Sequence, residues 1–176
     1  MHFMRGHLNG NPYLGIFACA NDSHLFVPIG AQKKAVQTMA QVLGAQPVYT
    51  TVAGTELIGT LMVANSEGVL LPPDATEIEI KTIGRAAKGR VGILDTRHNA
   101  LGNLIVANDN GAVVADVYGR EEVNDIRTAL GVEVRKGTIN NLNIVGSLCR
   151  ATNSAALMSP SASDREIKLI KDTLNV

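Results

Sequence analysis

Two cysteines, Cys19 and Cys149, are the residues of this sequence whose type most readily supports covalent chemistry. A cysteine becomes a nucleophile when a neighbouring base or cation lowers its pKa and favours the thiolate. Both lie in short apolar segments typical of strands, and no metal-ligand spacing surrounds either of them. Free cysteines in such segments are usually buried. We therefore expect both thiols to be packing residues, and two are too few for a disulfide scaffold.

The histidines and glycines offer little more for catalysis. His24 and His98 are isolated, without a partner at metal-ligand spacing. A phosphate-binding loop needs several glycines that lead into a helix N-terminus. The recurring glycines are instead expected to lead into strands and to allow close backbone approach or a positive φ: Gly15, Gly59, Gly102 and Gly146. The sequence therefore predicts no enzyme, no metal and no cofactor.

An apolar residue followed by glycine recurs along the whole chain. The spacings are 44, 43 and 44 residues for the pairs Leu14-Gly15, Ile58-Gly59, Leu101-Gly102 and Val145-Gly146. An Ala-Asn pair begins six residues after each of the first three, and Ala151-Thr152 takes that place in the last. A period in this range indicates stacked or radially arranged units. We expect one α/β domain over residues 1–176, with units at about 9–52, 53–95, 96–139 and 140–176.

Each unit has the same expected order of elements, which the third unit illustrates. Asn103–Ala107 and Ala112–Val114 are apolar segments that predict short strands, with turn residues over Asn108–Gly111. A helix is expected over Glu121–Leu130, where apolar residues three and four apart share one face. One unit cannot bury its sheet and helix faces alone, so neighbouring units must pack together. Closure into a ring would also remove exposed strand edges.

The other helices follow similar patterns. Thr76-x-x-Glu79 and Ser163-x-x-Glu166 are capping-box patterns that predict helix starts in the second and fourth units. Gly84, Lys88 and Gly89 weaken the second helix, so we expect it to stop early. Two sets of apolar residues are each expected on one helix face: Val36, Met39, Ala40 and Leu43 in the first unit, and Ile167, Ile170 and Leu174 in the fourth.

Composition and charge exclude several classes of protein. Apolar residues make up 45% of the chain, which predicts a folded protein. Sixteen basic residues balance sixteen acidic ones, so the chain has no net positive charge that would attract it to nucleic acid or to an anionic membrane. The N-terminal segment is too short and polar for a signal peptide, and no apolar run approaches the ~20 residues of a membrane span. We therefore expect a cytoplasmic protein with no membrane partner.

The repeated motifs resemble the initiation factor six family of archaea and eukaryotes. The strongest local match is Asn99-Ala100-Leu101-Gly102-Asn103, which continues into Ala107-Asn108-Asp109. The segments that resemble the first, second and fourth repeats of the family are Gly10–Gly15, Gly54–Asn65, and Gly137–Ile139 with Val145–Ser147. The resemblance covers essentially the whole chain in the order of the family, and its specificity comes from several motifs occurring together.

This resemblance implies a fold and a function. The fold is the pentein fold, an α/β propeller in which five units surround a pseudo-fivefold axis. The function is that of a non-enzymatic factor that binds the joining face of the large ribosomal subunit and sterically excludes the small subunit. The implied partner is a universal ribosomal protein near the sarcin-ricin loop.

The sequence departs from the family pattern in one respect. Leu174-Asn175-Val176 aligns with Leu130-Gly131-Val132 one repeat later, so a fifth unit is expected to begin where the sequence stops. We expect a pentein-like propeller of four repeats of about 44 residues, which closes differently, leaves an open edge or is a shortened form. An open edge would allow a second copy to bind by strand pairing, as a homo-oligomer.

The resemblance assigns Asn103 to the ribosomal-protein interface. The equivalent residues of the other units are Ile16, Thr60 and Ser147, which a ring would bring to one end of its axis. The structural alternative is that Asn103 bonds its own backbone at a turn or strand end. The predicted ribosome-binding residues are Asn99, Leu101, Gly102, Asn103, Gly59, Thr60, Gly146 and Ser147.

Other contacts and functions stay open. A basic group is the candidate for minor contact with ribosomal RNA: Lys81, Arg85, Lys88, Arg90 and Arg97. Such charges, like Lys33 and Lys34, more often face solvent. One alternative function is a shortened or designed pentein-like scaffold without ribosome binding. Another is a pentein enzyme that modifies guanidino groups, although the sequence lacks a His-containing loop beside a C-terminal Cys.

Overall fold

The computed structural model describes residues 5–87 and 90–176, in which one order of elements recurs. The first unit holds α1 (Leu14–Phe17), β1 (Cys19–Ala20), β2 (His24–Pro28), α2 (Lys33–Leu43) and β3 (Gln46–Thr50). The second holds α3 (Ile58–Leu61), β4 (Val63–Ala64), β5 (Gly68–Leu71), α4 (Glu77–Ala87) and β6 (Arg90–Ile93). The third holds α5 (Leu101–Leu104), β7 (Ile105–Ala107), β8 (Gly111–Ala115), α6 (Arg120–Leu130) and β9 (Glu133–Gly137). The fourth holds α7 (Val145–Leu148), β10 (Cys149–Ala151), β11 (Ala156–Met158) and α8 (Asp164–Leu174).

Each of the first three units has its own three-stranded sheet, in the orders β1-β2-β3, β4-β5-β6 and β7-β8-β9. The first two strands are antiparallel because a tight turn joins them. The third strand runs parallel to the second because a long helix carries the chain back between them. The fourth unit pairs β10 with β11.

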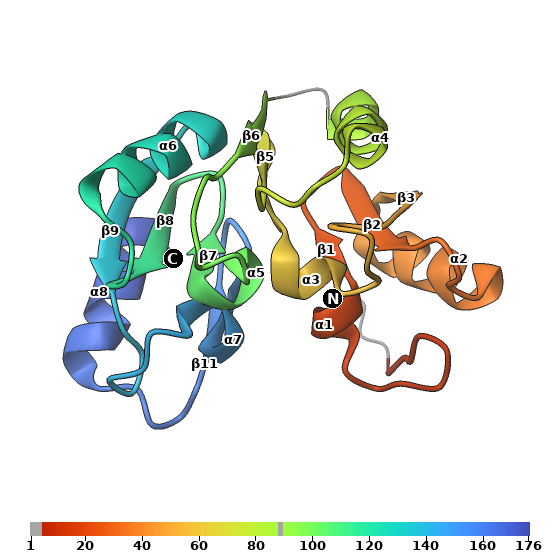
Figure 1. The fold of residues 1–176 in the computed structure, drawn as a ribbon. Coiled ribbons are helices and arrows are strands. Elements are labelled where there is room, and N and C mark those ends of the chain that lie inside the picture. The colour runs from red at the N-terminus through yellow and green to blue at the C-terminus, as the bar shows by residue number, and fades with distance from the viewer. Residues whose placement is uncertain (1–4, 88–89) are drawn as a thin grey trace.

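The four units surround one axis. The one-turn helices α1, α3, α5 and α7 gather at the centre of the molecule, and each contacts the next along the chain (Figure 1). The longer helices α2, α4, α6 and α8 lie towards the outside. A cavity of about 220 Å³ between the units is lined by residues of all four. The repeat therefore has a radial arrangement, although the sheets of the described residues do not join into one closed sheet.

The expectation that each repeated glycine leads into a strand is wrong. The glycine is the second residue of a one-turn helix in every unit. Asn103 therefore belongs to α5, and the expected strand over Asn103–Ala107 begins only at Ile105. A backbone hydrogen bond closes the turn, as from the Ala18 N–H to the Leu14 carbonyl at 2.9 Å. An apolar-Gly pair has little local preference, so packing around the axis decides its conformation.

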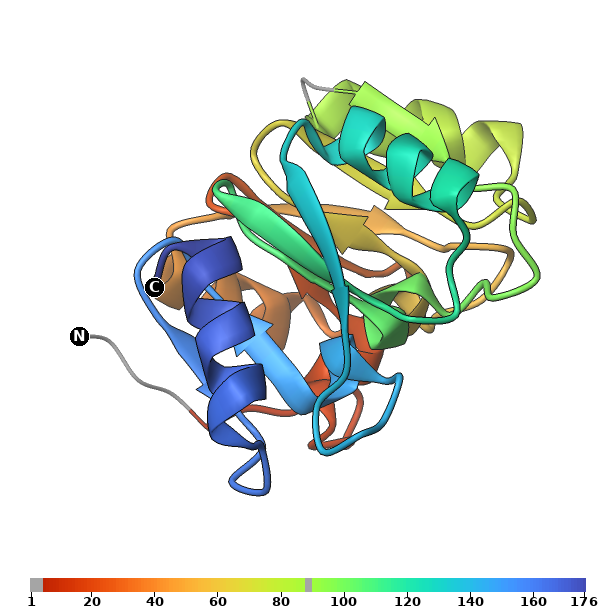
Figure 2. The same cartoon turned by 90° about the vertical axis from the view of Figure 1, so that its left-hand side faces the viewer.

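The long helices join neighbouring units. Helix α6 packs on β5 and β6 of the second unit as well as on its own β9, and α8 packs on β8 and β9 (Figure 2). The approach is close, because a Cβ added at Gly68 would collide with the Ala129 carbonyl of α6. A Cβ at Gly111 would likewise collide with the Thr173 carbonyl of α8. The helix of the next unit thus packs on the sheet of each of the first three units.

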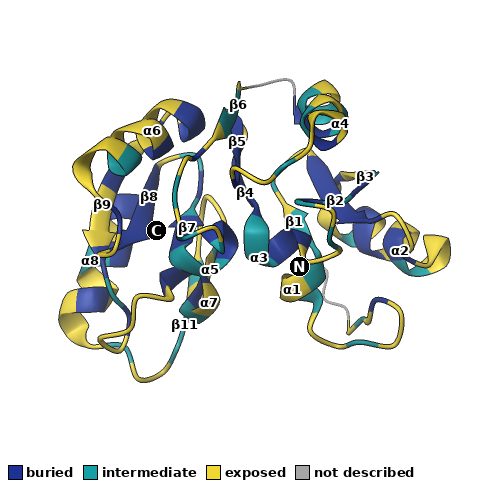
Figure 3. Cartoon of the chain, viewed as in Figure 1, coloured by how far each residue is buried: buried dark blue, intermediate teal, exposed yellow. Residues whose placement is uncertain are grey.

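The middle strands form the core. Every residue of β2, β5 and β8 is buried, whereas the long helices expose their outer faces (Figure 3). Strand β11 differs because Leu157 is 78% exposed, whereas Leu70, at the same register position of β5, is 1% exposed. Leu70 packs against residues of the third unit. Among the described residues, nothing covers the equivalent face of the fourth sheet.

Both predicted capping boxes are confirmed. The Thr76 N–H donates to Glu79 Oε2 at 2.8 Å, and the Ser163 N–H donates to Glu166 Oε2 at 2.9 Å. The same carboxylates also accept backbone N–H bonds from tight turns, from Gly54 to Glu79 at 2.9 Å and from Asn141 to Glu166 at 3.1 Å. Each glutamate therefore connects the N-terminus of a long helix, α4 or α8, to the tight turn before the one-turn helix of the same unit, α3 or α7.

Three details of the helices differ from expectation. Helix α4 does not stop early: it runs to Ala87, and its packing on β3 and β6 outweighs the weak helix propensity of Gly84. Lys88 and Gly89 lie outside the described residues. Leu43 is half exposed, because it lies outside the core cluster that Val36, Met39 and Ala40 of α2 join. Ile167 is 39% exposed, because it lies at the edge of the buried face of α8.

No helix within residues 5–87 and 90–176 has the length and apolar character needed to cross a bilayer.

Candidate functional site

One end of the axis is formed by the one-turn helices and the residues before them. We call this surface the helix pole and define it as Tyr13–Phe17, Leu57–Leu61, Ala100–Leu104 and Ile144–Leu148. These segments contain no charged residue. The first residue of each helix is buried in the second to fourth units, and it anchors the turn in the core.

Glycines set how closely the one-turn helices approach one another. A Cβ added at Gly102 would collide with the Gly59 carbonyl and would lie 2.9 Å from the Met62 carbonyl. A Cβ at Gly59 would collide with the Gly15 and Ala18 carbonyls, and one at Gly146 with the Gly102 carbonyl. The predicted architectural role of these three glycines, close backbone approach, is confirmed. Gly15 differs, because a Cβ added there would meet only the Arg150 side chain, at 3.5 Å.

The predicted docking residues divide into two groups by burial. Gly59, Leu101, Gly102 and Gly146 are buried and hold the helices together. The others reach the surface of the helix pole or its rim: Thr60 and Asn103 are half-buried, and Asn99 and Ser147 are exposed. Contact between the helices places the residues after each glycine on one surface.

The side chains of Asn103 and Asn99 differ in what they bind. The Asn103 amide makes no hydrogen bond with any residue in the two described ranges, so it does not cap its own backbone there. Asn99 donates to Asp74 Oδ2 at 3.4 Å, a weak contact with the second unit. The Asn103 amide is therefore available to a partner, and the structural alternative for it does not apply within these residues.

The apolar part of the helix pole was not predicted from the sequence. Tyr13, Leu57 and Ile144 directly precede the one-turn helices of three units, and Ile16 follows Gly15. All four are exposed, Tyr13 to 68%. The repeat itself contained the signal, because Tyr13, Leu57, Ala100 and Ile144 occupy one repeat position. Large exposed apolar residues gathered on one surface are typical of protein contact sites.

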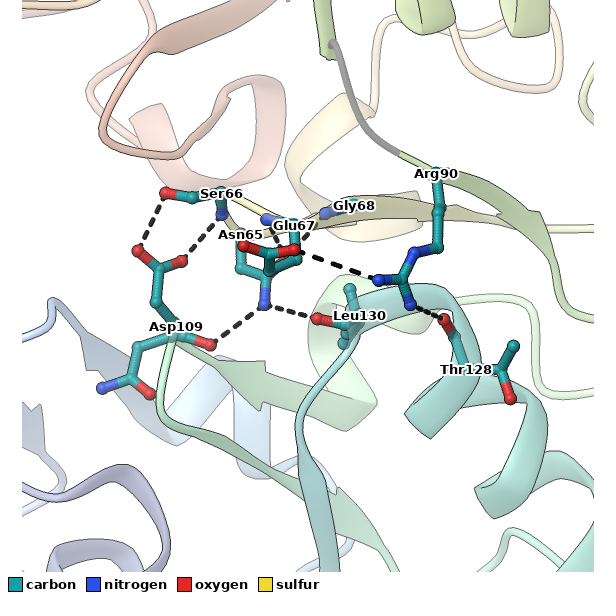
Figure 4. A network of polar contacts seen from close by, with 9 residues as sticks. Asn65, Ser66, Glu67, Gly68, Arg90, Asp109, Thr128 and Leu130 are labelled. Atoms are coloured by element: carbon teal, nitrogen blue, oxygen red, sulfur yellow. Dashed lines mark hydrogen bonds and ion pairs between the residues drawn. The ribbon is translucent and has the colours of Figure 1, made fainter.

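At the far end of the short strands, asparagines bond one unit to the next. The Asn65 side chain donates to the Asn108 carbonyl at 3.2 Å and to the Leu130 carbonyl at 2.9 Å (Figure 4). Asn21 and Asn108 make the equivalent bonds to the Asn65 and Thr152 carbonyls. Because these amides are used in holding the units together, the repeated Ala-Asn pair is structural.

Asp109 strengthens this end of the axis. It accepts from the Ser66 N–H at 2.7 Å and from the Ser66 hydroxyl at 2.8 Å (Figure 4). Burial alone would raise the pKa of Asp109, but these bonds and one from Asn153 lower it below its usual value. Asn153 also donates to Asp22 Oδ2 at 3.0 Å, which joins the fourth unit to the first.

The cysteines lack the environment of a nucleophile. Cys19 lies in β1 and Cys149 in β10, as expected. Burial raises the pKa of both thiols to about 11, and the charge of Arg150 offsets this only in part. A thiol with so high a pKa is protonated at neutral pH and is a poor nucleophile.

The candidate basic group is spread over separate elements. Lys81 in α4 pairs with Glu77 at 3.4 Å, and Arg90 in β6 donates to the Thr128 carbonyl at 3.0 Å. Arg85 and Arg97 are exposed, and Lys88 lies outside the described residues. Across residues 5–87 and 90–176, no three His, Cys, Asp or Glu side chains are grouped to hold a metal ion.

Comparison with known proteins gives this architecture a family. The eIF-6 family matches residues 3–176, almost the whole chain. The chain belongs to the eIF-6 family. Members of this family are translation factors rather than enzymes. Family membership therefore excludes the alternative of a pentein enzyme that modifies guanidino groups.

Archaeal members of the eIF-6 family show how much of the protein is shared. Translation initiation factor 6 of Pyrococcus abyssi is 36% identical over 100% of this chain and 80% of its own length. The Pyrococcus horikoshii protein of the same name is 34% identical with the same coverage. That of Cenarchaeum symbiosum is 43% identical over 77% of this chain, and the match spans 62% of its length.

Proposed function

We propose that this chain binds the large ribosomal subunit through the helix pole and thereby prevents the small subunit from joining. The observation that carries the proposal is the gathering of equivalent residues from four units on one uncharged surface. Membership of the eIF-6 family supplies the ribosome as the partner. The same membership leads us to propose that the units form a pentein-like propeller, and that the protein acts in the cytoplasm.

The chemistry of the helix pole favours a protein partner over RNA. RNA binding depends on cations that neutralise phosphates, and the helix pole has none. Its exposed apolar residues suit the desolvated centre of a protein interface, and Asn103, Thr60 and Ser147 supply hydrogen-bonding groups. The proposed partner is a universal ribosomal protein near the sarcin-ricin loop. The basic residues Lys81, Arg85 and Arg97 are proposed to make at most minor contacts with ribosomal RNA.

The proposed mechanism is steric and needs no bound nucleotide or metal. A rigid docked body occupies the joining face, so the small subunit cannot reach its own contacts. The close packing of glycine against carbonyl at the axis keeps the helix pole rigid. Occupancy of the large subunit then determines how many ribosomes can assemble.

A subunit-joining experiment tests the proposal. Large subunits are incubated with the chain, small subunits are added, and sucrose gradients separate joined from free subunits. We expect the wild-type chain to reduce the joined fraction in proportion to its occupancy. Asn103→Arg is expected to lose this effect while the melting temperature changes little. The Asn103 side chain has no hydrogen bond to lose among the described residues, and a bulky cation would disrupt the contact.

Asn124→Arg is the matched control, since Asn124 lies exposed on α6 away from the helix pole. It should act like the wild-type chain. If the wild-type chain never sediments with large subunits, the protein is a scaffold with the fold of the family and without its binding. If Asn103→Arg loses stability and binding together, Asn103 is structural.

A further inference from the structure

Arg150 is a charged residue at a repeat position that is apolar in the other units. It lies five residues after the first residue of α7, as Cys19, Val63 and Val106 do in their own units. Val63 and Val106 are buried in cores that contain residues of the following unit. Arg150 instead lines the axial cavity and reaches from the fourth unit towards α1 of the first.

The guanidinium of Arg150 has weak partners. Its Nη1 donates to the Gly102 carbonyl at 3.4 Å and its Nη2 to the Gly15 carbonyl at 3.5 Å. Both distances exceed the usual range for N–H donors. Within the described part of the chain no carboxylate lies within 4.0 Å of it, whereas Arg90 and Arg135 each have a glutamate. The guanidinium has five N–H donors, so most of its capacity remains available.

The walls of the cavity carry no negatively charged side chain, and their polar groups are backbone atoms such as the Gly102 carbonyl that accepts from Arg150. Apart from Arg150, the cavity is lined by alanines and glycines together with Cys19, Met62, Val63, Ile105 and Val106. Cys19 is the other titratable residue among them, and with a pKa of about 11 its thiol is neutral at physiological pH. The cavity therefore has a net positive charge. Arg150 itself is exposed, so its guanidinium is open to ligands from solution.

We propose that the axial cavity binds a small oxyanion, such as inorganic phosphate or sulfate, held by the guanidinium of Arg150. A planar guanidinium forms paired, charge-assisted hydrogen bonds with oxyanions. The cavity volume of about 220 Å³ is several times the ~30 Å³ of a water molecule, so a tetrahedral oxyanion fits with its remaining water. The proposal does not depend on ribosome binding.

Calorimetric titration with sodium phosphate tests the site, with sodium chloride holding the ionic strength constant. The wild-type chain is expected to bind phosphate saturably at one site. Arg150→Val introduces the residue that the second and third units have at this position, so the variant should fold. It is expected to bind phosphate at least about tenfold more weakly, because the charge-assisted bonds are lost. Arg150→Lys keeps the positive charge but loses the paired N–H donors of the guanidinium, so this variant should bind phosphate with intermediate affinity.

Arg127→Gln is the matched control, because it removes an exposed charge of α6 that lies outside the cavity. It should bind phosphate like the wild-type chain. No saturable binding by the wild-type chain, or equal affinity in Arg150→Val, overturns the proposal.

A second readout needs no variant of Arg150. Phosphate beside Cys19 should slow alkylation of that thiol, measured at alkaline pH by mass spectrometry of the modified peptide. The expected result is slower modification with phosphate than with chloride. An equal rate in the two salts would also overturn the site, even if Arg150→Val failed to fold.

Discussion

Single glutamates connect helix capping to the geometry of the turns. Glu166 accepts backbone N–H groups from Ser163 at 2.9 Å and from Asn141 at 3.1 Å. The Ser163 N–H bond is the main cause that lowers the pKa of Glu166 to about 2, and burial opposes it. Asn140 and Asn141 both have positive φ, so this carboxylate also stabilises a turn in the left-handed region. One side chain thus supports a helix start and the approach to α7.

The lowered pKa of Glu166 predicts a pH dependence of stability. A carboxyl group whose pKa is lower in the folded state stabilises that state above its unfolded pKa. Its contribution is complete above about pH 4.5 and is lost as the pH falls towards 2. Urea unfolding across this range should show Glu166→Gln about 1–2 kcal/mol less stable at pH 7, with the difference shrinking at low pH. A constant difference from pH 7 to pH 2.5 would contradict this role.

At the scale of elements, packing between units determines the conformation of segments for which the local sequence has no clear preference. Capping boxes and helix faces follow from residue order, so the long helices could be predicted with ends within one residue for α6. The one-turn helices could not, because Leu101-Gly102 carries no local helix signal and its conformation depends on Gly59 of another unit. The exposure of Leu43 could not be predicted either, because helical spacing does not say how wide the buried face of α2 is. The resemblance identified Asn103, whereas the apolar residues beside it required the structure.

The repeated glycines give a matched test of this packing. Gly102→Ala would place a Cβ against the Gly59 carbonyl, and relieving this clash requires the backbone of α3 or α5 to shift. We expect a loss of about 1–3 kcal/mol in the free energy of unfolding. Gly15→Ala meets only the Arg150 side chain at 3.5 Å, an ordinary contact. It should be neutral or stabilise by up to about 1 kcal/mol, because alanine favours a helix. Urea unfolding of both variants measures the contrast, and equal losses would contradict the packing described.

Across the whole molecule, the units differ in how well they are covered. Leu70 and Leu157 occupy the same register position, but the third unit buries Leu70 and nothing among the described residues buries Leu157. The period predicted stacked or radially arranged units, because faces that recur every 44 residues must cover one another, and the structure shows the radial arrangement. The period could not predict the bonds that join the first and fourth units, because Asn153 and Arg150 depart from the repeat.

Alanine substitution at these two leucines tests the difference in coverage. Leu70→Ala should cost about 2–5 kcal/mol, since it leaves a cavity in a buried cluster. Leu157→Ala should change the free energy of unfolding by less than about 0.5 kcal/mol in the monomeric chain. Denaturation at two protein concentrations completes the test. A large cost at Leu157 that grows with concentration would mean that a second copy covers β11.

The proposed docking face can be tested most directly by photo-crosslinking from two positions in complexes with the large subunit. Ser147→Cys lies on the helix pole and Ser66→Cys at the far end of the axis, and both serines are exposed. The native thiols, with pKa values near 11, should stay unlabelled by a benzophenone maleimide at neutral pH. We predict crosslinks to a ribosomal protein from position 147 and none from position 66. Crosslinks from position 66 alone, or equally from both, would contradict docking through the helix pole.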